Sequence, residues 1–473
     1  MSPSVVNFPP DLDSRFVSLK KKLVAPENRE KVTASWKRLL KALEVETEII
    51  AEQGSKYVPQ IDWQDIVDNN YQLPQDASSN FKQKGVIMIN GVIPEKQIDT
   101  WFQELVDFCK QHPETAGYTF PNPASWYNVF WTKPQVEARS HPNIQKLMNL
   151  MSKQFYVNDP NTLIDLDSQI VYGDRIRIRQ PGTKAKLSLH LDSSSIERWE
   201  DDNFRKVYQE IFDGNWEDWD PFKLDARAYA NENLYHDYSV ARDTICSSFR
   251  TLQGWLALSD NKTGEGTLKV LPNIKTTMAY LMLRPLFWKD PESGNIDDYE
   301  MDLTTSKFPG TIPSTGQLFV KDEYFHHLQQ NRSSVGIPDV KKGTFVFWHC
   351  DLPHEVDKEH NGPDHSSVFY YGQTPLSLVN INSLLDTRKS FLENVSPDDY
   401  RTQLSEKEKK NEFQGADVKN IQNDEGFRSM GLKPFDVDEP NLTEGQRQIR
   451  KLANAALESN HFDYQKHIYN QNI

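Results

Sequence analysis

The chain has 473 residues, enough for one elaborated domain or for two to three domains of roughly 150 residues each. It carries 54 Lys and Arg against 68 Asp and Glu, and this net charge of −14 argues against a general nucleic-acid binder, which needs clustered basic residues. No apolar stretch approaches the roughly 18 residues that span a membrane, and residues 1–13 lack a signal-peptide pattern. We therefore expect a soluble cytoplasmic protein without nucleic-acid or membrane partners, and the oligomeric state is open.

Helical spacing of apolar residues dominates residues 1–160. This spacing predicts a helix over 28–51 and a clearer one over 94–111. Between them, the apolar run 85–89 predicts a buried strand. We expect this N-terminal region to be mainly helical and to pack on the domain that follows.

Residues 161–385 change character, because short runs of β-branched and aromatic residues alternate with Gly, Pro and Asp turns. The runs are 170–178, 187–191, 252–258, 267–271, 317–320, 344–348 and 367–371. Segments 198–245 and 275–310 interrupt them and are predicted to be insertions that shape the mouth of a pocket. Many short strands without regular helices between them predict a jelly-roll barrel, and the fold class is therefore α+β.

Charged, helix-forming sequence returns in residues 386–473. Segments 400–413 and 443–459 are predicted to be solvated helices on the outside of the barrel. This part of the chain is therefore expected to be a C-terminal helical extension.

A pair of possible metal ligands lies on one predicted strand. His190 and Asp192 share a face, because side chains alternate with a period of two along a strand. The candidate third ligand is His354, which follows the predicted strand 344–348. Two imidazoles and one carboxylate leave coordination positions open, as in non-haem Fe(II) oxygenases. Three widely spaced cysteines give no support to a thiolate site or a disulfide framework.

The same downstream segment contains a rival pair, because His349 and Asp351 are also spaced as His-x-Asp. We favour His354 as the ligand because it follows the end of the strand. His349 and Asp351 are then expected to be structural or to support the ligands.

In four segments the chain resembles the 2-oxoglutarate/Fe(II) dioxygenases of the double-stranded β-helix fold, in particular the phytanoyl-CoA-hydroxylase-like and YbiU-like proteins. The segments are residues 85–94, the pair His190 and Asp192, residues 255–272 and residues 343–354. Each segment alone is weak evidence, but their order along residues 85–375 is fairly specific.

This resemblance implies an enzyme that oxidises a small molecule with O₂ while it decarboxylates 2-oxoglutarate to succinate. It implies that His190, Asp192 and His354 bind Fe(II). It also implies that Trp255 lies on the strand that lines the 2-oxoglutarate site.

One departure from the family concerns the far carboxylate of 2-oxoglutarate. Such enzymes usually place an Arg or Lys about ten residues after the distal His, where a guanidinium can make a charge-assisted contact. Here the corresponding residue is His365. The replacement candidates are Arg250 and Gln253, near Trp255, and Lys133 from the helical region is a further one.

A run of alternate arginines offers another source of positive charge. Arg175, Arg177 and Arg179 share one face of a predicted strand, while Ile176 and Ile178 share the other. Either face could line the cavity, and we expect the apolar face to do so.

The missing arginine keeps two other functions open. One is a cupin-like barrel that binds a small molecule without oxygenase chemistry, since a fold does not fix a function. The other is a metal-dependent oxygenase that does not use 2-oxoglutarate. The sequence does not identify the primary substrate.

Overall fold

The computed structural model describes residues 10–118, 125–185, 187–232, 234, 246–288, 299–313, 315–401 and 415–469. Within these residues the larger sheet has the strand order β1-β2-β14-β8-β16-β6-β4-β3, and β5 also pairs with β16. In that order the strands are Gln60–Asp62, Val86–Asn90, Phe345–His349, Leu252–Ala257, Ser366–Ser377, Ile176–Arg179, Trp126–Tyr127 and Ala116–Tyr118, and β5 is Ile164–Ile170. Except for the parallel pair β1 and β2, its pairings are antiparallel.

A smaller antiparallel sheet has the strand order β12-β7-β15-β9-β13. These strands are Leu318–Phe319, His190–Leu191, His354–Val356, Leu268–Val270 and Val335–Gly336. A separate two-stranded ribbon is formed by β10 (Phe287–Trp288) and β11 (Glu300–Met301).

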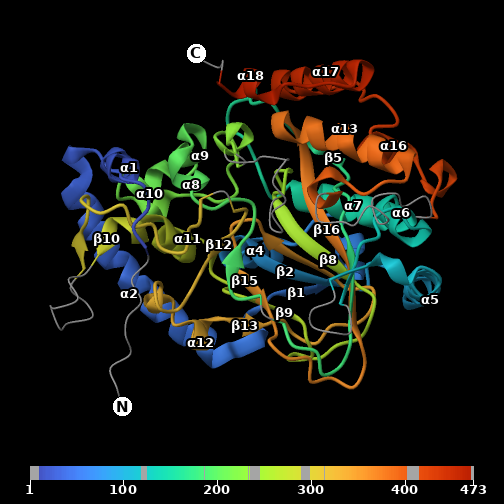
Figure 1. Ribbon diagram of the computed structural model, residues 1–473, viewed down its shortest axis with the longest axis horizontal. Coiled ribbons are helices and arrows are strands. Elements are labelled where there is room, and N and C mark those ends of the chain that lie inside the picture. Colours follow the sequence, from blue (N-terminus) through green and yellow to red (C-terminus); the bar gives the residue numbers. More distant parts are fainter. Residues whose placement is uncertain are drawn as a thin grey trace.

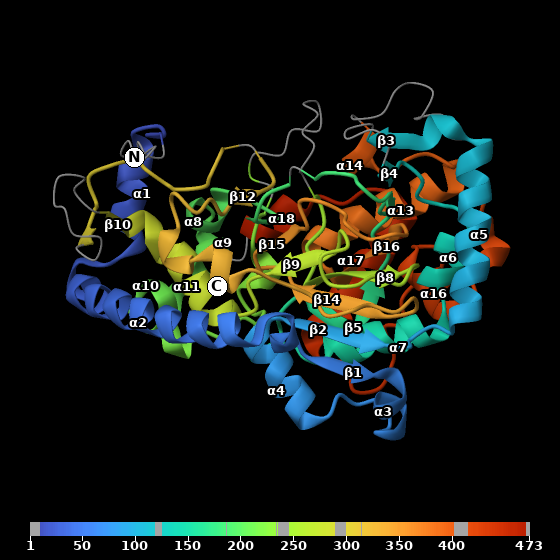
Figure 2. The ribbon, with the colours of Figure 1, turned by 90° about the horizontal axis from the view of Figure 1, so that it is seen from below.

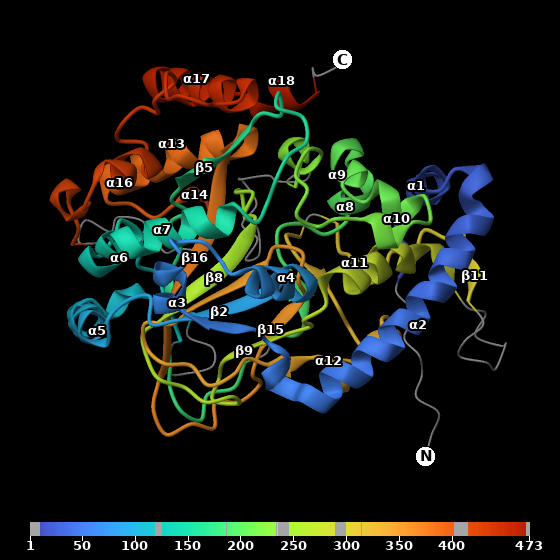
Figure 3. The same ribbon diagram turned by 180° about the vertical axis from the view of Figure 1, so that it is seen from behind.

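Helices surround the sheets in two groups (Figure 1). One group contains α1 (Arg15–Leu23), α2 (Arg29–Gln53), α8 (Glu197–Glu200), α9 (Asp202–Lys206), α10 (Gln209–Phe212) and α11 (Ile274–Leu283). The other contains α5 (Glu95–Gln111), α6 (Lys133–Arg139), α7 (Pro142–Ser152), α13 (Leu378–Glu393), α16 (Asp424–Ser429), α17 (Glu444–Ser459) and α18 (Tyr464–Tyr469). The short helices α3 (Trp63–Asp68), α4 (Gln75–Lys84), α12 (Gln330–Ser333) and α14 (Asp398–Arg401) complete the described set. The view from behind shows the two groups on opposite sides of the sheets (Figure 3).

The larger sheet buries both of its faces. Ile87, Phe345 and Phe347 belong to a core cluster that includes apolar residues of α5 and α7. Met88 and Val346 point to the other face and join a cluster that contains residues of the smaller sheet and of α2 and α11. The two sheets therefore enclose the interior in which the functional site lies, and Figure 2 shows α2 along one side of it.

Several expectations from the sequence are confirmed. The predicted helices 28–51, 94–111 and 443–459 correspond to α2, α5 and α17, and the predicted strand 85–89 corresponds to β2. The architecture is mixed α and β with more than one sheet, as expected. The predicted helix 400–413 falls almost wholly outside the described residues. None of the described helices is both long and apolar enough to cross a membrane.

The N-terminal region also contributes strands to the larger sheet. β1 pairs with β2, and β2 pairs with β14, so residues before 160 extend this sheet. The division into regions 1–160, 161–385 and 386–473 stays a prediction. Helix α13, which follows β16 directly, was not predicted.

Candidate metal centre

Strands β7 and β15 bring two imidazoles together. His190 and His354 are direct partners in this antiparallel pair, and their ring centroids lie 4.4 Å apart. Directly opposed residues project from the same face of a sheet, and here both side chains reach the cavity. Strand register alone therefore joins two residues that are 164 positions apart in the sequence.

Asp192 completes the set just beyond the end of β7. Its Oδ1 lies 3.5 Å from Nε2 of His190, and its Oδ2 lies 3.4 Å from Nε2 of His354. The next two residues, Ser193 and Ser194, have φ values of 63° and 132°, which residues other than glycine rarely adopt. This sharp turn ends the strand and leaves the carboxylate between the two imidazoles.

Backbone carbonyls fix the tautomer of both imidazoles. Nδ1 of His190 lies 2.7 Å from the Ser188 carbonyl oxygen, and Nδ1 of His354 lies 3.1 Å from that of Leu352. A carbonyl oxygen can only accept, so each Nδ1 carries a proton, and Nε2 is the nitrogen of each ring that could bind a metal ion. Burial and the neighbouring His190 lower the pKa of His354, which favours its neutral, ligating form. This donor set fits a metal ion.

Two glutamine amides hold the carboxylate of Asp192. Gln253 Nε2 donates to Oδ2 at 2.6 Å, and Gln317 Nε2 donates to Oδ1 at 2.7 Å. The Trp348 indole in turn donates to Gln253 Oε1 at 2.9 Å. Burial acts to raise the pKa of Asp192, but the imidazoles beside it hold that pKa well below its usual range. The group is thus an anion at neutral pH, as a ligand must be.

The rival cluster around His349 has its polar atoms already engaged. His349 Nε2 lies 3.0 Å from the Pro221 carbonyl oxygen, and its Nδ1 accepts from the Asp351 N–H at 3.0 Å. The Asp351 carboxylate accepts from Arg198 at 2.6 Å, and Arg227 lies 3.5 Å away. Two guanidinium groups beside a carboxylate disfavour a cation there. The geometry therefore favours His190, Asp192 and His354 as the metal ligands.

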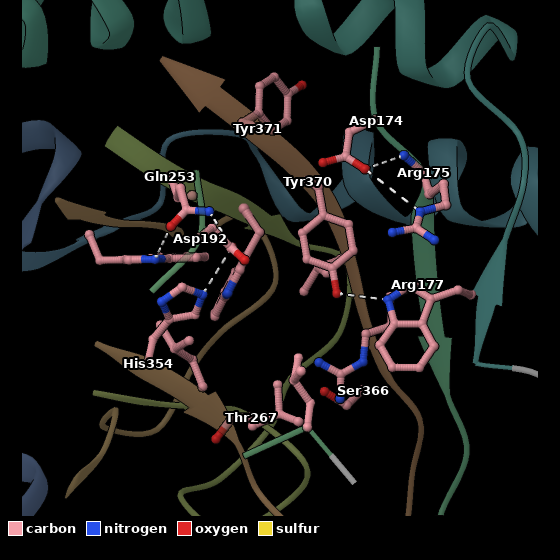
Figure 4. Close-up of a pocket in the computed structure, with 18 of the residues that line it drawn as sticks. Asp174, Arg175, Arg177, Asp192, Gln253, Thr267, His354, Ser366, Tyr370 and Tyr371 are labelled. Carbon is pink, nitrogen blue, oxygen red and sulfur yellow. Dashed lines mark hydrogen bonds and ion pairs between the residues drawn. The ribbon is translucent and has the colours of Figure 1, made fainter. Parts of the chain in front are cut away.

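A cavity of about 470 Å³ opens beside the three ligands (Figure 4). Arg175, Arg177 and Arg250 are among the residues that line it, whereas Ile176 and Ile178 belong to the core on the other face of the sheet. The prediction that the apolar face of this strand lines the cavity is therefore wrong. Both faces of β6 are buried, so alternation alone did not identify the face on the cavity.

The four candidate contacts for the co-substrate are placed differently. Trp255 and Arg250 line the cavity, and Gln253 also lines it although its amide is engaged by Asp192 and Trp348. Lys133 lies at the surface, where its ammonium is 2.8 Å from the Glu104 carboxylate, and it does not line the cavity.

Comparison with known proteins gives relatives of nearly full length. The solved structure of the GlcNAc-inducible gene 2 product, GIG2, from Candida albicans is 61% identical, covers 98% of each chain and has a TM-score of 0.90. A hypothetical protein from Escherichia coli is 25% identical, covers 90% of this chain and 100% of its own, and has a TM-score of 0.74. The protein YbiU of Escherichia coli K12 is 28% identical over 399 residues, which are 82% of this chain and 88% of YbiU.

The family assignment corrects one part of the expected resemblance and supports another. The similarity to YbiU is confirmed, but the family model that matches is not that of the phytanoyl-CoA hydroxylases. The matching model is Gig2-like, and it covers residues 10–432. The chain therefore belongs to the Gig2-like family.

Proposed function

We propose that this protein is an Fe(II)- and 2-oxoglutarate-dependent dioxygenase that oxidises a small molecule. The observation that carries the proposal is the set of two imidazoles and one carboxylate around a single point, with a cavity beside it. Such a set leaves coordination positions for a chelating 2-oxo acid and for O₂.

The sheet arrangement supports this proposal. We take two sets of four neighbouring strands, β6-β16-β8-β14 and β7-β15-β9-β13, as the two sheets of a double-stranded β-helix. The resemblance implies that Trp255, which lies on β8, is on the strand that lines the 2-oxoglutarate site. Here β7 and β15 supply the ligands, and β8 with β16 forms the facing wall.

Arg177 is our candidate for the far carboxylate of 2-oxoglutarate. It pairs with Val368 of β16, and Val368 pairs with Ala257 of β8. Gln253 contacts Asp192 and so marks the level of the metal ligands on β8. Ala257 is four residues further along this strand, which is about 13 Å at about 3.3 Å per residue. The long side chain of Arg177 can cover part of this distance between its own strand position and the metal ligands.

The surroundings of Arg177 suit an anion. The residue is only 6% exposed, its Nη2 donates to the Gly266 carbonyl oxygen at 2.9 Å, and its Nε has no hydrogen-bond partner among the described residues. Figure 4 shows Arg177, Ser366 and Tyr370 on one side of the cavity. Ser366 begins β16 directly after His365, which stands where the family usually has its arginine, so a neighbouring strand supplies the guanidinium instead.

The remaining residues position and protect the reactants. Gln253 and Gln317 hold the carboxylate of Asp192 in place, and Trp255 lies between Gln253 and Ala257 on the cavity wall. Aromatic side chains such as Trp255, Trp348 and Tyr370 line the cavity and leave less room for water around bound reactants. When bound at these ligands, Fe(II) would supply the activation of O₂ that this class of oxidation needs.

Binding measurements on matched variants test the proposal. We expect His190→Ala and His354→Ala to lose bound Fe(II), and Arg177→Met to keep Fe(II) but to bind 2-oxoglutarate at least tenfold more weakly. Metal analysis gives the first result and anaerobic calorimetry the second, with Lys133→Met as a control for the loss of one exposed cation. Full iron content in both histidine variants would refute the ligand assignment. Unchanged 2-oxoglutarate affinity in Arg177→Met would refute the assignment of Arg177 to the far carboxylate of 2-oxoglutarate.

A further inference from the structure

A second arginine of the cavity has no anionic partner among the described residues. Arg250 is 8% exposed, and its only hydrogen bond in the described part of the chain is the one from Nη2 to Ser193 Oγ at 3.0 Å. Its buried Nε has no partner there, and no carboxylate of the described residues lies within ion-pair distance. Burial of a guanidinium without an anion is costly, so this arrangement points to a ligand that carries one.

The side chain of Arg250 is held in a defined position. Its guanidinium lies 5.6 Å from the centroid of the Tyr172 ring, within the range of a cation–π contact. A Cβ at Gly372 of β16 would come within 2.8 Å of Arg250 Cδ, so the arginine stem crosses the strand where a side chain is absent. Ser193 has φ 63° in the turn after Asp192, and this turn presents its hydroxyl to the guanidinium. Three separate segments therefore fix this one cation.

Arg250 and Arg177 reach the cavity at different levels of the larger sheet. The side chain of Arg250 crosses β16 at Gly372, which pairs with Gln253, whereas Arg177 is level with Ala257, four residues after Gln253. Gln253 marks the position of the ligands through its bond to Asp192. Figure 4 shows the two ends of the cavity, with Tyr371 at one end and Ser366 at the other.

The far carboxylate of one co-substrate molecule can reach only one of these two arginines. If 2-oxoglutarate extends from the metal ligands to Arg177, its far carboxylate points away from Arg250. Arg250 then remains available to a second anion in the same cavity, on the side that holds Tyr172 and Tyr371.

We infer that Arg250, with Ser193, binds an oxyanion group of the primary substrate, so that the substrate is a small molecule with a carboxylate or a phosphate. This inference rests on the proposed function, because it assigns the other arginine to 2-oxoglutarate. A charge-assisted contact at this end of the cavity orients the substrate over the metal ligands.

Fluorine NMR with two small probes tests the inference. Trifluoroacetate carries a carboxylate, and trifluoroethanol is the neutral control; both are titrated into the Zn(II)-loaded protein with saturating 2-oxoglutarate. We expect the wild type to bind trifluoroacetate in preference to trifluoroethanol, Arg250→Met to bind it at least tenfold more weakly, and Arg250→Lys to recover part of the affinity. Competition by inorganic phosphate, compared with competition by acetate, distinguishes a phosphate site from a carboxylate site.

Arg38→Met serves as the matched control, since Arg38 is an exposed cation paired with Glu217, and Arg177→Met, with 2-oxoglutarate raised to saturate it, tests whether the probe uses the other arginine. Both are expected to bind trifluoroacetate as the wild type does. The inference is overturned if the wild type does not bind the probe, if Arg250→Met binds it unchanged, or if Arg177→Met loses it. Calorimetry with 2-oxoglutarate on the same samples reports separately on the proposed function. If 2-oxoglutarate does not bind, the probe still reports on Arg250.

Discussion

Replacing Gln253 with methionine should weaken metal binding without removing a metal ligand. The change deletes the 2.6 Å bond that Gln253 donates to Asp192, and it leaves the buried Trp348 indole N–H without its acceptor at 2.9 Å. Loss of an orienting contact to a ligand typically costs roughly 10- to 100-fold in metal affinity. The unpaired indole N–H should also destabilise the metal-free protein by about 1–3 kcal/mol.

Competition calorimetry with a chelator measures the metal affinity, and urea denaturation of the metal-free protein measures the free energy of unfolding. Gln317→Met should weaken metal binding in a similar way, because Gln317 holds the other oxygen of Asp192. Gln448→Met is a control on the exposed face of α17, where the amide contacts only Glu444 among the described residues. Metal affinity within twofold of the wild type in Gln253→Met would refute the role of this bond.

Three further predictions concern ligand choice, pH and backbone geometry. His349→Asn should keep bound Fe(II) whereas His354→Ala should lose it, and the opposite pattern in metal analysis would move the site to the rival cluster. Burial raises the pKa of Glu46 from 4.5 to about 7. The contribution of Glu46 to stability therefore falls as the pH rises through this range, because the buried carboxyl group must then ionise. Glu46→Gln should be more stable than the wild type at about pH 8, by up to about 3 kcal/mol, and similar to it at about pH 5. Denaturation curves that differ equally at both pH values would contradict this. Gly343→Ala should cost at least about 2 kcal/mol, because φ is 86° and a Cβ would clash with the carbonyl oxygen of Ile93, while Gly182→Ala, with φ 75° and open space, should cost less in the same assay.

Residues with a clear periodicity could be predicted from the sequence alone. Trp101 and Leu105 recur at helical spacing and lie on the buried face of α5, while exposed residues separate them. The run 85–89 is apolar throughout, and it became β2 in the interior of the larger sheet. In these elements the buried surface is the apolar surface, so the pattern of residue types predicts both the element and its buried face.

Elements that are buried on several sides could not be predicted in this way. Helix α13 buries polar residues such as Asn380 and Ser390 together with its apolar ones, so its buried face is not the face that residue types mark as apolar. Asn380 donates to the Phe249 carbonyl oxygen at 2.8 Å, a long-range contact that no local pattern indicates. The arginines of β6 are buried for a similar reason, since Arg179 donates to carbonyl oxygens such as that of Asp357.

The candidate ligands could be proposed from spacing, but their supporting residues could not. His190 and Asp192 stand two positions apart, which a strand places on one face. Gln317 lies 125 positions from Asp192, and only the pairing of β12 with β7 brings it near. Arg177 was predicted to lie on the face away from the cavity, because both faces of β6 are buried and alternation does not distinguish them.

The most direct test of the central claim is an anaerobic titration of the metal-free protein with Fe(II) and then with 2-oxoglutarate, followed by visible absorption. A 2-oxo acid that chelates Fe(II) gives a metal-to-ligand charge-transfer band. We predict a band that requires both additions and is absent from His190→Ala. Iron binding without the band in the wild type would contradict the account, because the site would then hold a metal but not the co-substrate.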